Sequence, residues 1–327
     1  MSDAEADRDP AAEFEAERGR LTAVAYRMLG SRSEAEDAVQ ETWLRYAGAL
    51  GDPAARAEVR QLGAWLTTTC ARVCLDVLRS ARVRREAYPG QWLPEPEVAP
   101  LDEGPRADGF APDPQERAVR ADQVDTALRV VLDRLGPEQR VAFVLHDVFG
   151  VPFGRIAEAL GTTEAAARQL ASRARRAVHA PDRPRHTADP AEQRRVVAAF
   201  AAAAHSGRLD ELVKVLAPEV VLIGDGGRHF RAGPRPILGA AKVGRFVLAL
   251  FSATGHHAAH LRARPVLVDG AVGLLLETVY ADGRPVRLVS AFAVADGRIT
   301  GIFNQLNPEK VAGVPELGAD DRWPLRW

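Results

Sequence analysis

Cysteine is almost absent from this sequence: the only two cysteines among 327 residues are Cys70 and Cys74. They stand four positions apart, which places them one turn apart on a predicted helix. A structural zinc site needs four ligands, and no other ligand residues cluster beside this pair. A disulfide framework of the kind that holds small secreted domains together is likewise excluded. We therefore predict that both cysteines are small buried residues in a reduced protein.

Long hydrophobic runs are also missing. No apolar stretch approaches the ~20 residues that a membrane helix needs, and the acidic start, MSDAEADRD, is unlike a secretory signal. These absences predict a cytoplasmic protein with no membrane partner. Lysine is scarce too, since the 43 basic residues include only Lys214, Lys242 and Lys310. With a net charge of −1, any affinity for nucleic acid must come from local arginine patches.

The most informative stretch is residues 151–179, VPFGRIAEALGTTEAAARQLASRARRAVH. It predicts two short helices, the first ended by Gly161 and the second capped by Thr162 or Thr163. Alanine and leucine at three- and four-residue spacing give the second helix an inward face. Its other side carries polar residues that suit phosphate contacts and base reading: Arg168, Gln169, Ser172, Arg173, Arg175 and Arg176. This pattern is typical of a DNA-binding helix-turn-helix, the alternative being a surface helix hairpin with solvated arginines.

Two amphipathic helices are predicted near the start of the chain. The first runs from about Phe14 to Leu29 and ends at Gly30, and a capping box of Ser33 and Glu36 starts the second. The outer face of the second helix is acidic and amide-bearing and would suit a basic partner: it carries Asp37, Gln40, Glu41 and Arg45. The alternative is an ordinary solvated face.

A third helix is predicted from about Gln61 to Arg85. Trp65, Leu66, Cys70 and Val73 belong to its inward face, and we place Thr67, Thr68, Arg72 and Asp76 outside it. The helix ends in a basic segment formed by Arg79, Arg82, Arg84 and Arg85. Such an end, next to a tryptophan, could hold single-stranded DNA through its phosphates and unstacked bases. Arginines that only satisfy the helix dipole are the alternative.

Taken together, these segments resemble a known family. DAVQETWLR (residues 37–45), AWLTTTCARVCLDVLRSARVRRE (residues 64–86) and the helix-turn-helix are similar to regions 2 and 4 of extracytoplasmic-function (ECF) RNA polymerase sigma factors, over residues 14–179. The resemblance implies that the acidic face of residues 37–45 binds the β′ clamp helices of core polymerase. It implies that Arg72, Asp76 and the basic helix end engage the melted −10 element, and that residues 168–176 read the −35 element. Such a factor uses no cofactor and no catalytic residue.

A proline-rich linker follows, from residue 87 to residue 114. Its composition predicts an extended, semi-rigid spacer without a core of its own between the two DNA-reading modules. Trp92 and Leu93 are unusual in a solvated spacer, and we expect them to dock, although a lone exposed aromatic is the alternative. QWLPEP (residues 91–96) matches a linker motif of the sigma-factor subgroup that carries a carboxy-terminal extension.

The last part of the chain, after a hinge at residues 181–189, has a different pattern. Two amphipathic helices precede strand-like runs, and Asp-Gly pairs at 269–270, 282–283 and 296–297 predict two-residue hairpin turns. This predicts an α+β domain with a curved antiparallel sheet. It resembles the cone-shaped SnoaL-like domain of the nuclear-transport-factor-2 (NTF2) superfamily. Two motifs of the subgroup, expected to be structural or interfacial, are Asp225-Gly226-Gly227 and Asn307-Pro308-Glu309-Lys310-Val311.

Catalysis by this domain is a weaker alternative. Asp225, His229, Glu277 and Tyr280 are candidate general bases, but no spacing selects a pair. His256 and His260 lack a carboxylate at ligand spacing, so we expect no metal site.

We therefore predict a multidomain protein with two all-α sigma domains and an α+β SnoaL-like domain. The expected boundaries are 1–86 for region 2, 87–114 for the linker, 115–180 for region 4, 181–189 for the hinge and 190–327 for the SnoaL-like domain. The partners would be core polymerase, through β′ and β, and promoter DNA, with a small ligand in the SnoaL-like pocket left open. The carboxy-terminal domain would regulate activity in cis. The alternatives are a ligand-responsive repressor or activator that uses the helix-turn-helix alone, and a DNA-tethered SnoaL-type isomerase or cyclase.

Overall fold

The computed structural model describes residues 9–50, 55–56, 58–59, 61–86, 90–101, 131–132, 135–178, 180, 184, 186–230, 232–233, 235–255, 261–279, 283–321 and 325, with side chains omitted for 82–86 and 251–255. The described residues form two compact units. Residues 9–86 and 131–180 make the first, and residues 90–101 and 184–325 make the second. Each is described by itself.

The first unit begins with three helices, α1 (Pro10–Leu29), α2 (Arg32–Leu50) and α4 (Leu62–Glu86), as the sequence predicts. Gly30 ends α1 in the left-handed conformation, with φ of 76°. The predicted capping box of Ser33 and Glu36 is wrong. Ser33 lies inside α2, and the hydroxyl of Ser31 accepts a hydrogen bond from the Glu34 amide at 3.4 Å instead. The left-handed turn at Gly30 ends α1 so abruptly that the next helix starts earlier than expected.

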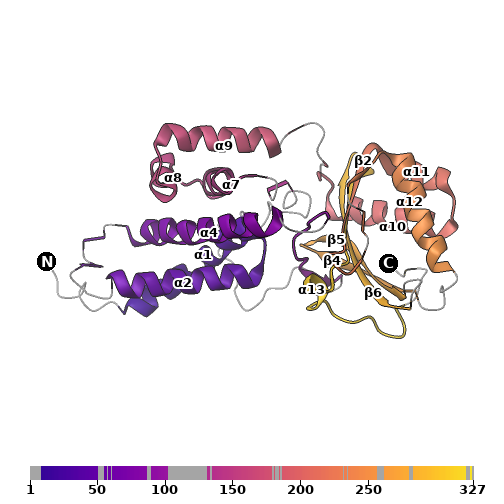
Figure 1. Cartoon of the computed structure of the whole chain (residues 1–327), viewed down its shortest axis with the longest axis horizontal. Helices are drawn as coiled ribbons and strands as arrows, with labels where there is room; N and C mark the ends of the chain where they lie inside the picture. Colours follow the sequence, from indigo (N-terminus) through magenta and orange to yellow (C-terminus); the bar gives the residue numbers. More distant parts are fainter. Residues whose placement is uncertain are drawn as a thin grey trace. The chain divides into compact units, whose positions relative to one another are not determined.

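Among the described residues, this unit also contains α7 (Pro137–Phe143), the π-helix η1 (Val144–Val148), α8 (Phe153–Leu160) and α9 (Glu164–Val178). Helix α4 packs against α1 and α2 on one side and against α7 and α8 on another (Figure 1). The predicted placement of Thr67 and Thr68 is wrong, because both are 5% exposed rather than outward-facing. The hydroxyl of Thr67 accepts a hydrogen bond from Arg20 of α1 at 2.8 Å. Cys70 and Cys74 are fully buried, as predicted.

The second unit is an α+β domain, which confirms the predicted fold class. Its elements are β1 (Val98–Pro100), α10 (Pro190–Ser206), α11 (Leu209–Val215), β2 (Leu216–Asp225), β3 (Ile237–Leu238), α12 (Ala240–Gly255), β4 (Arg262–Val268), β5 (Ala271–Val279), β6 (Pro285–Ala295), β7 (Arg298–Gln305) and α13 (Pro308–Val311). Two of the predicted Asp-Gly turns are confirmed, because Asp269, Gly270, Asp296 and Gly297 all have positive φ. Asp282 lies outside the described residues.

The sheet has the order β1-β4-β5-β6-β7-β2-β3, and it departs from the sequence prediction in two ways. It is mixed rather than antiparallel, because β2 runs parallel to β7. Its first edge strand, β1, comes from the segment predicted as a spacer, with Val98 opposite Val268 in β4. Residues 90–101 therefore belong to the carboxy-terminal domain and share its core. Residues 102–114 of the linker lie outside the described part.

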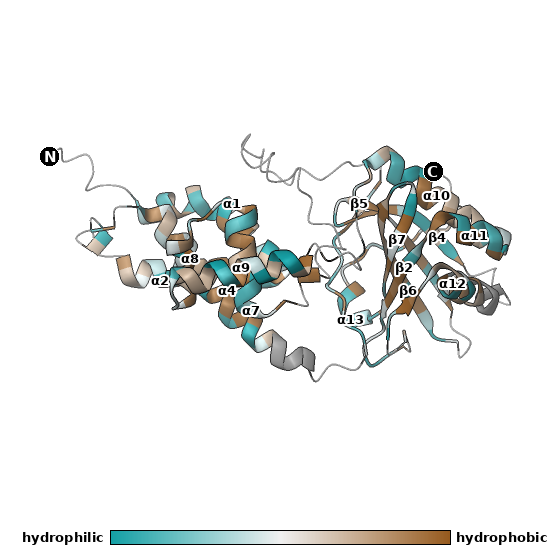
Figure 2. Ribbon diagram, turned by 90° about the horizontal axis from the view of Figure 1, so that it is seen from above, coloured by the Kyte–Doolittle hydropathy of each residue, from teal (hydrophilic) through white to brown (hydrophobic). Residues whose placement is uncertain are grey.

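The sheet is covered on both faces. Helices α10, α11 and α12 pack on one face around Val197, Phe200 and Phe292. The other face is covered by Leu93 of the linker and by Val311, Val314 and Leu317 near the carboxyl end. Figure 2 shows hydrophobic stretches along the strands between these two layers. Within the described residues, no helix is both long and apolar enough to cross a bilayer.

Candidate nucleic-acid interface and linker site

Helix α9 carries the predicted duplex-reading residues on its solvent side. Arg168, Gln169, Arg173 and Arg176 are exposed and Ser172 is half-buried, while Ala167, Ala171 and Ala174 are fully buried on the opposite side. The small alanines let α9 pack closely on α7 and α8. The face is therefore held on a rigid element.

The bend before α9 is fixed by local hydrogen bonds. Gly161 ends α8 with φ of 63°, and Thr163 rather than Thr162 caps α9, with its hydroxyl 3.2 Å from the Ala166 amide. Glu164 pairs with Arg168, and the Arg168 guanidinium lies 5.5 Å from the centre of the Phe153 ring. Arg175 has a different role from the exposed arginines, because it pairs with Asp147 of η1. The turn thus leaves the arginine-bearing face of α9 exposed to solvent, as the helix-turn-helix pattern predicts.

The predicted polymerase-binding residues lie together on α2. Asp37, Gln40 and Arg45 are exposed and Glu41 is half-buried. Glu41 and Arg45 form an ion pair of 2.9 Å one turn apart. Leu44 lies beside them and is 58% exposed, which is unusual for a large hydrophobic residue. The face combines acidic, amide and apolar groups, as a protein-binding surface does.

Two of the predicted −10 residues contact the helix-turn-helix half of the unit. Arg72 donates to the Glu158 carbonyl at 2.8 Å and lies 3.8 Å from the Glu158 carboxylate. Arg79 donates to the Glu138 carboxylate at 2.9 and 3.1 Å. Asp76 is exposed between them. The side chains of Arg82, Arg84 and Arg85 lie outside the described part. Sequence patterns did not reveal these pairings, because both acids look like ordinary helix surface residues.

The linker binds the carboxy-terminal domain through Leu93. Its side chain is 2% exposed, and its amide donates to Asp225 Oδ2 at 2.9 Å. Its carbonyl accepts from Lys310 Nζ at 2.6 Å and from Gln305 Nε2 at 3.2 Å. Both main-chain polar groups of a buried residue are therefore satisfied.

Lys310 joins three parts of this site. Its ammonium lies 2.7 Å from Asp225 Oδ2 and 4.2 Å from the centre of the Trp92 ring. Asp225 is fully buried and the Lys310 side chain is 15% exposed. Gln305, at the end of β7, was not a predicted site residue. The only signal in the sequence was that this glutamine stands two positions after the apolar run GIF (residues 301–303).

The two motifs of the carboxy-terminal domain also meet here. Asp225 Oδ1 accepts from the Gly227 amide at 3.0 Å, and Asn307 caps α13 by accepting from the Glu309 amide at 3.1 Å. A Cβ at Gly227, where φ is 57°, would stand 2.8 Å from the Asn307 side chain. A Cβ at Gly226 would stand 2.1 Å from the Phe230 carbonyl oxygen. The glycines are therefore needed for close packing.

Comparison with known proteins identifies the two helical parts of the first unit. Residues 14–84 match the family model of sigma-70 region 2, and residues 125–178 match that of sigma-70 region 4. The ECF RNA polymerase sigma factor SigJ of Mycobacterium tuberculosis is 43% identical over 317 residues, which cover 93% of each chain. This chain belongs to the ECF RNA polymerase sigma factors. It directs RNA polymerase to promoters and initiates transcription, as the combination of regions 2 and 4 requires.

Other relatives of this ECF sigma factor agree. SigI of Mycobacterium tuberculosis, named as a probable ECF sigma factor, is 36% identical over 302 residues, or 92% of this chain and 94% of the relative. The crystal structure of SigJ is similar with a TM-score of 0.68 at 40% identity, and covers 93% of this chain and 99% of that one. The match to region 2 accounts for α4, which a repressor acting through the helix-turn-helix alone leaves unexplained.

The candidate bases of the sigma factor's carboxy-terminal domain are engaged in other contacts. Glu277 lies 2.7 Å from Arg262 and 2.8 Å from Arg287. Asp225 is paired with Lys310, and the exposed His229 lies 3.3 Å from Glu309. His256, His260 and Tyr280 lie outside the described residues, and the described residues contain no cluster of three ligands suited to a metal. The geometry thus gives no support for a general base.

Proposed function

We propose specific roles for the residues of this sigma factor, which acts with RNA polymerase in the cytoplasm. The α2 face of Asp37, Gln40, Glu41 and Arg45 binds core polymerase, and α9 reads the −35 element. Helix α4 binds the melted −10 element, and the carboxy-terminal domain regulates the factor by holding the linker. Solvent exposure of the charged faces of α2 and α9 supports the first two roles.

The −10 role requires the first unit to open. Arg72 and Arg79 are paired with Glu158 and Glu138, so single-stranded DNA must compete with these acids for both arginines. The side chains are 38% to 52% exposed, and such pairs each contribute only about 0.2–1 kcal/mol. The two ion pairs therefore lower the affinity for single-stranded DNA without preventing its binding. The described arrangement is a closed state in equilibrium with an open one.

Replacing the two acids tests this closed state. The Glu138→Gln/Glu158→Gln variant should bind a single-stranded oligonucleotide of mixed sequence about two- to thirtyfold more tightly than the wild type, from the summed energies of two such pairs. Fluorescence anisotropy of the full chain measures the affinity. Glu36→Gln is the matched control, because Glu36 pairs with Arg32 on an exposed face of α2. Equal affinities in all three proteins would contradict the closed state.

Regulation by the carboxy-terminal domain depends on the contact between Asp225 and the Leu93 amide. Leu93 lies in the linker between region 2 and region 4. Releasing Leu93 from the carboxy-terminal domain therefore changes how the linker connects the two regions. Point variants are better than truncation, since removing the domain would expose Leu93 and leave β1 without its partner strand.

The decisive experiment is transcription in vitro by core polymerase supplied with each full-length protein and a pool of genomic DNA fragments. The wild type should yield transcripts from defined promoters. Lys310→Met should change the yield several-fold, whereas Lys214→Met, at an exposed site on α11, should not. Failure of the wild type to start transcription would overturn the initiating role. Equal yields from all three proteins would overturn only the regulatory role.

A further inference from the structure

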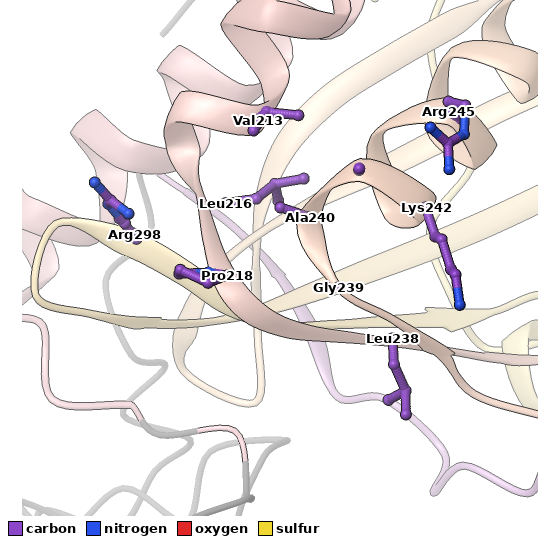
Figure 3. Close-up of a pocket in the computed structure, with 10 residues that line it drawn as sticks. Val213, Leu216, Pro218, Leu238, Gly239, Ala240, Lys242, Arg245 and Arg298 are labelled. Atoms are coloured by element: carbon purple, nitrogen blue, oxygen red, sulfur yellow. The ribbon is translucent and has the colours of Figure 1, made fainter.

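A hollow of about 510 Å³ opens on the carboxy-terminal domain between α11, the start of β2 and the junction of β3 with α12 (Figure 3). Its lining is apolar along the middle, where Val213, Leu216, Pro218 and Leu238 contribute. Leu238 is 58% exposed, like Leu44 on α2, and these are the two large hydrophobic residues that stand out as exposed in the described chain. An apolar side chain left this accessible in a concave site indicates a binding surface.

Among the described residues that line the hollow, three are cationic and none is acidic. Lys242 and Arg245 project from α12 on one side, and Arg298 lies at the other end, beyond Pro218 (Figure 3). Among the described residues, these three side chains have neither an ion pair nor a hydrogen bond. Other arginines of this domain are paired, as Arg208 is with Asp210 and Arg262 is with Glu277. Because the whole chain carries a net charge of −1, the excess of positive charge is local to the hollow.

We propose that this hollow binds a small amphiphilic anion, an apolar carboxylate, with its head at Lys242 and Arg245. These two side chains stand three positions apart, so they share one side of α12 and reach the same carboxylate. The first turn of α12 forms part of the lining, and its N–H dipoles favour the same charge. The apolar body lies over Val213 and Leu238.

The lining argues against other occupants. Divalent metal ions need carboxylate or imidazole ligands, and the described residues of the lining supply neither. Single-stranded nucleic acid would need aromatic side chains for stacking, and no aromatic side chain is found among those lining residues. The volume lies within the range of ~300–1,000 Å³ that is typical of small-molecule sites, whereas a stable peptide or protein partner would bury a much larger surface.

The test uses sodium decanoate, below its micelle concentration, as the probe and isothermal titration calorimetry of the full chain. We expect saturable binding with one site. The Lys242→Ala/Arg245→Ala variant should bind about five- to tenfold more weakly, since it loses two charge-assisted contacts at an exposed site. Leu238→Ser should also weaken binding, through the lost apolar contact. Thermal unfolding of each variant checks that the fold is kept.

Matched controls locate the head and the tail. Lys214→Ala removes an exposed lysine of α11 that does not line the hollow, and it should leave the affinity unchanged. Arg298→Ala, at the far end, should change it by less than about twofold. Decyl glucoside has the same chain length without the charge and should bind at least fivefold more weakly than decanoate.

Three outcomes would overturn the proposal. The first is the absence of saturable binding of decanoate, whether or not a short acidic peptide binds in its place. The second is equal affinity for decanoate and decyl glucoside. The third is equal affinity of the wild type and the Lys242→Ala/Arg245→Ala variant. None of these measurements uses transcription, so they stand apart from the regulatory role proposed above.

Discussion

The ammonium of Lys310 lies 4.2 Å from the centre of the Trp92 ring. The same ammonium donates a hydrogen bond to the carbonyl of Leu93, the residue after Trp92, which lies 217 positions before the lysine in the sequence. A cation over an indole contributes about 0.5–2 kcal/mol. The contact therefore orients the linker more than it stabilises the domain. The stability of the carboxy-terminal domain depends instead on the buried carboxylate of Asp225, which pairs with Lys310.

Replacing Asp225 should be strongly destabilising. Asp225→Ala leaves the largely buried Lys310 ammonium without its carboxylate and the Leu93 amide without its acceptor. We expect the free energy of unfolding of the carboxy-terminal domain to fall by about 3–5 kcal/mol. Urea unfolding followed by tryptophan fluorescence measures it.

Asp210→Ala is the control for that prediction. Asp210 pairs with Arg208, but its side chain is 59% exposed, so its loss should leave the free energy of unfolding nearly unchanged. A similar loss of free energy of unfolding in Asp210→Ala and Asp225→Ala would show that burial does not explain how much Asp225 contributes to stability.

A second buried carboxylate, Glu277, should behave in the same way. Its side chain is 11% exposed and lies between Arg262 and Arg287, and both arginines also donate to main-chain carbonyls near the carboxyl end, at Leu317 and Val314. Glu277→Gln should lower the free energy of unfolding by about 2–4 kcal/mol, because both arginines lose the carboxylate that they share. Hydrogen exchange of residues 314–318 should accelerate in this variant. Unchanged exchange there would contradict the view that Glu277 holds this segment.

The arginines of α9 make separable contributions to duplex binding. Arg173→Ala and Arg176→Ala should each weaken binding to a duplex with the −35 element by about 1–3 kcal/mol if the side chain reads a base. If it contacts only a phosphate, the slope of affinity against salt should fall by about one instead. Electrophoretic mobility shifts at several salt concentrations distinguish the two. Arg175→Ala is the comparison, since Arg175 is paired with Asp147, and it should affect stability more than the salt slope.

The two cysteines should be unreactive in the folded protein. Both are fully buried, and a hydrogen bond with Cys70, together with burial, raises the pKa of the Cys74 thiol well above its usual value. The thiolate is the reactive form, so very little of Cys74 is reactive. The hydrogen bond with Cys74 lowers the pKa of the Cys70 thiol, and complete burial keeps reagents away from that thiol. Ellman's reagent should label neither thiol in buffer and both thiols in 8 M urea. Rapid labelling of the native protein would show that α4 opens readily.

Much of the fold could be predicted because local patterns decide it. The six buried residues of α1, the alanine stripe of α9 and the Asp-Gly turns all follow from spacing or backbone preference. The parallel pairing of β2 with β7 and the recruitment of β1 could not, since each depends on partners at least 80 positions away. Thr67 and Thr68 were misplaced for a related reason. A polar residue on a helix indicates solvent unless a second helix covers it.

The site was predicted to a similar extent. The sequence singled out the motifs at Trp92, Asp225 and Asn307, but nothing in their spacing shows that Leu93 and Asp225 would be hydrogen-bonded. Gln305 was missed because glutamine carries no motif by itself. The roles of the α2, α4 and α9 residues stay predictions until binding is measured.

Strand β1 has a consequence for how the protein is made. Val98 pairs with Val268, 170 positions later, so a ribosome adding about 5–20 residues per second needs roughly 10–35 s between them. During that interval the nascent chain has finished both promoter-reading regions, whereas Leu93 has no sheet to cover it. Newly made sigma regions therefore exist briefly without the domain that holds their linker, and a chaperone or the polymerase itself has its first access to them then.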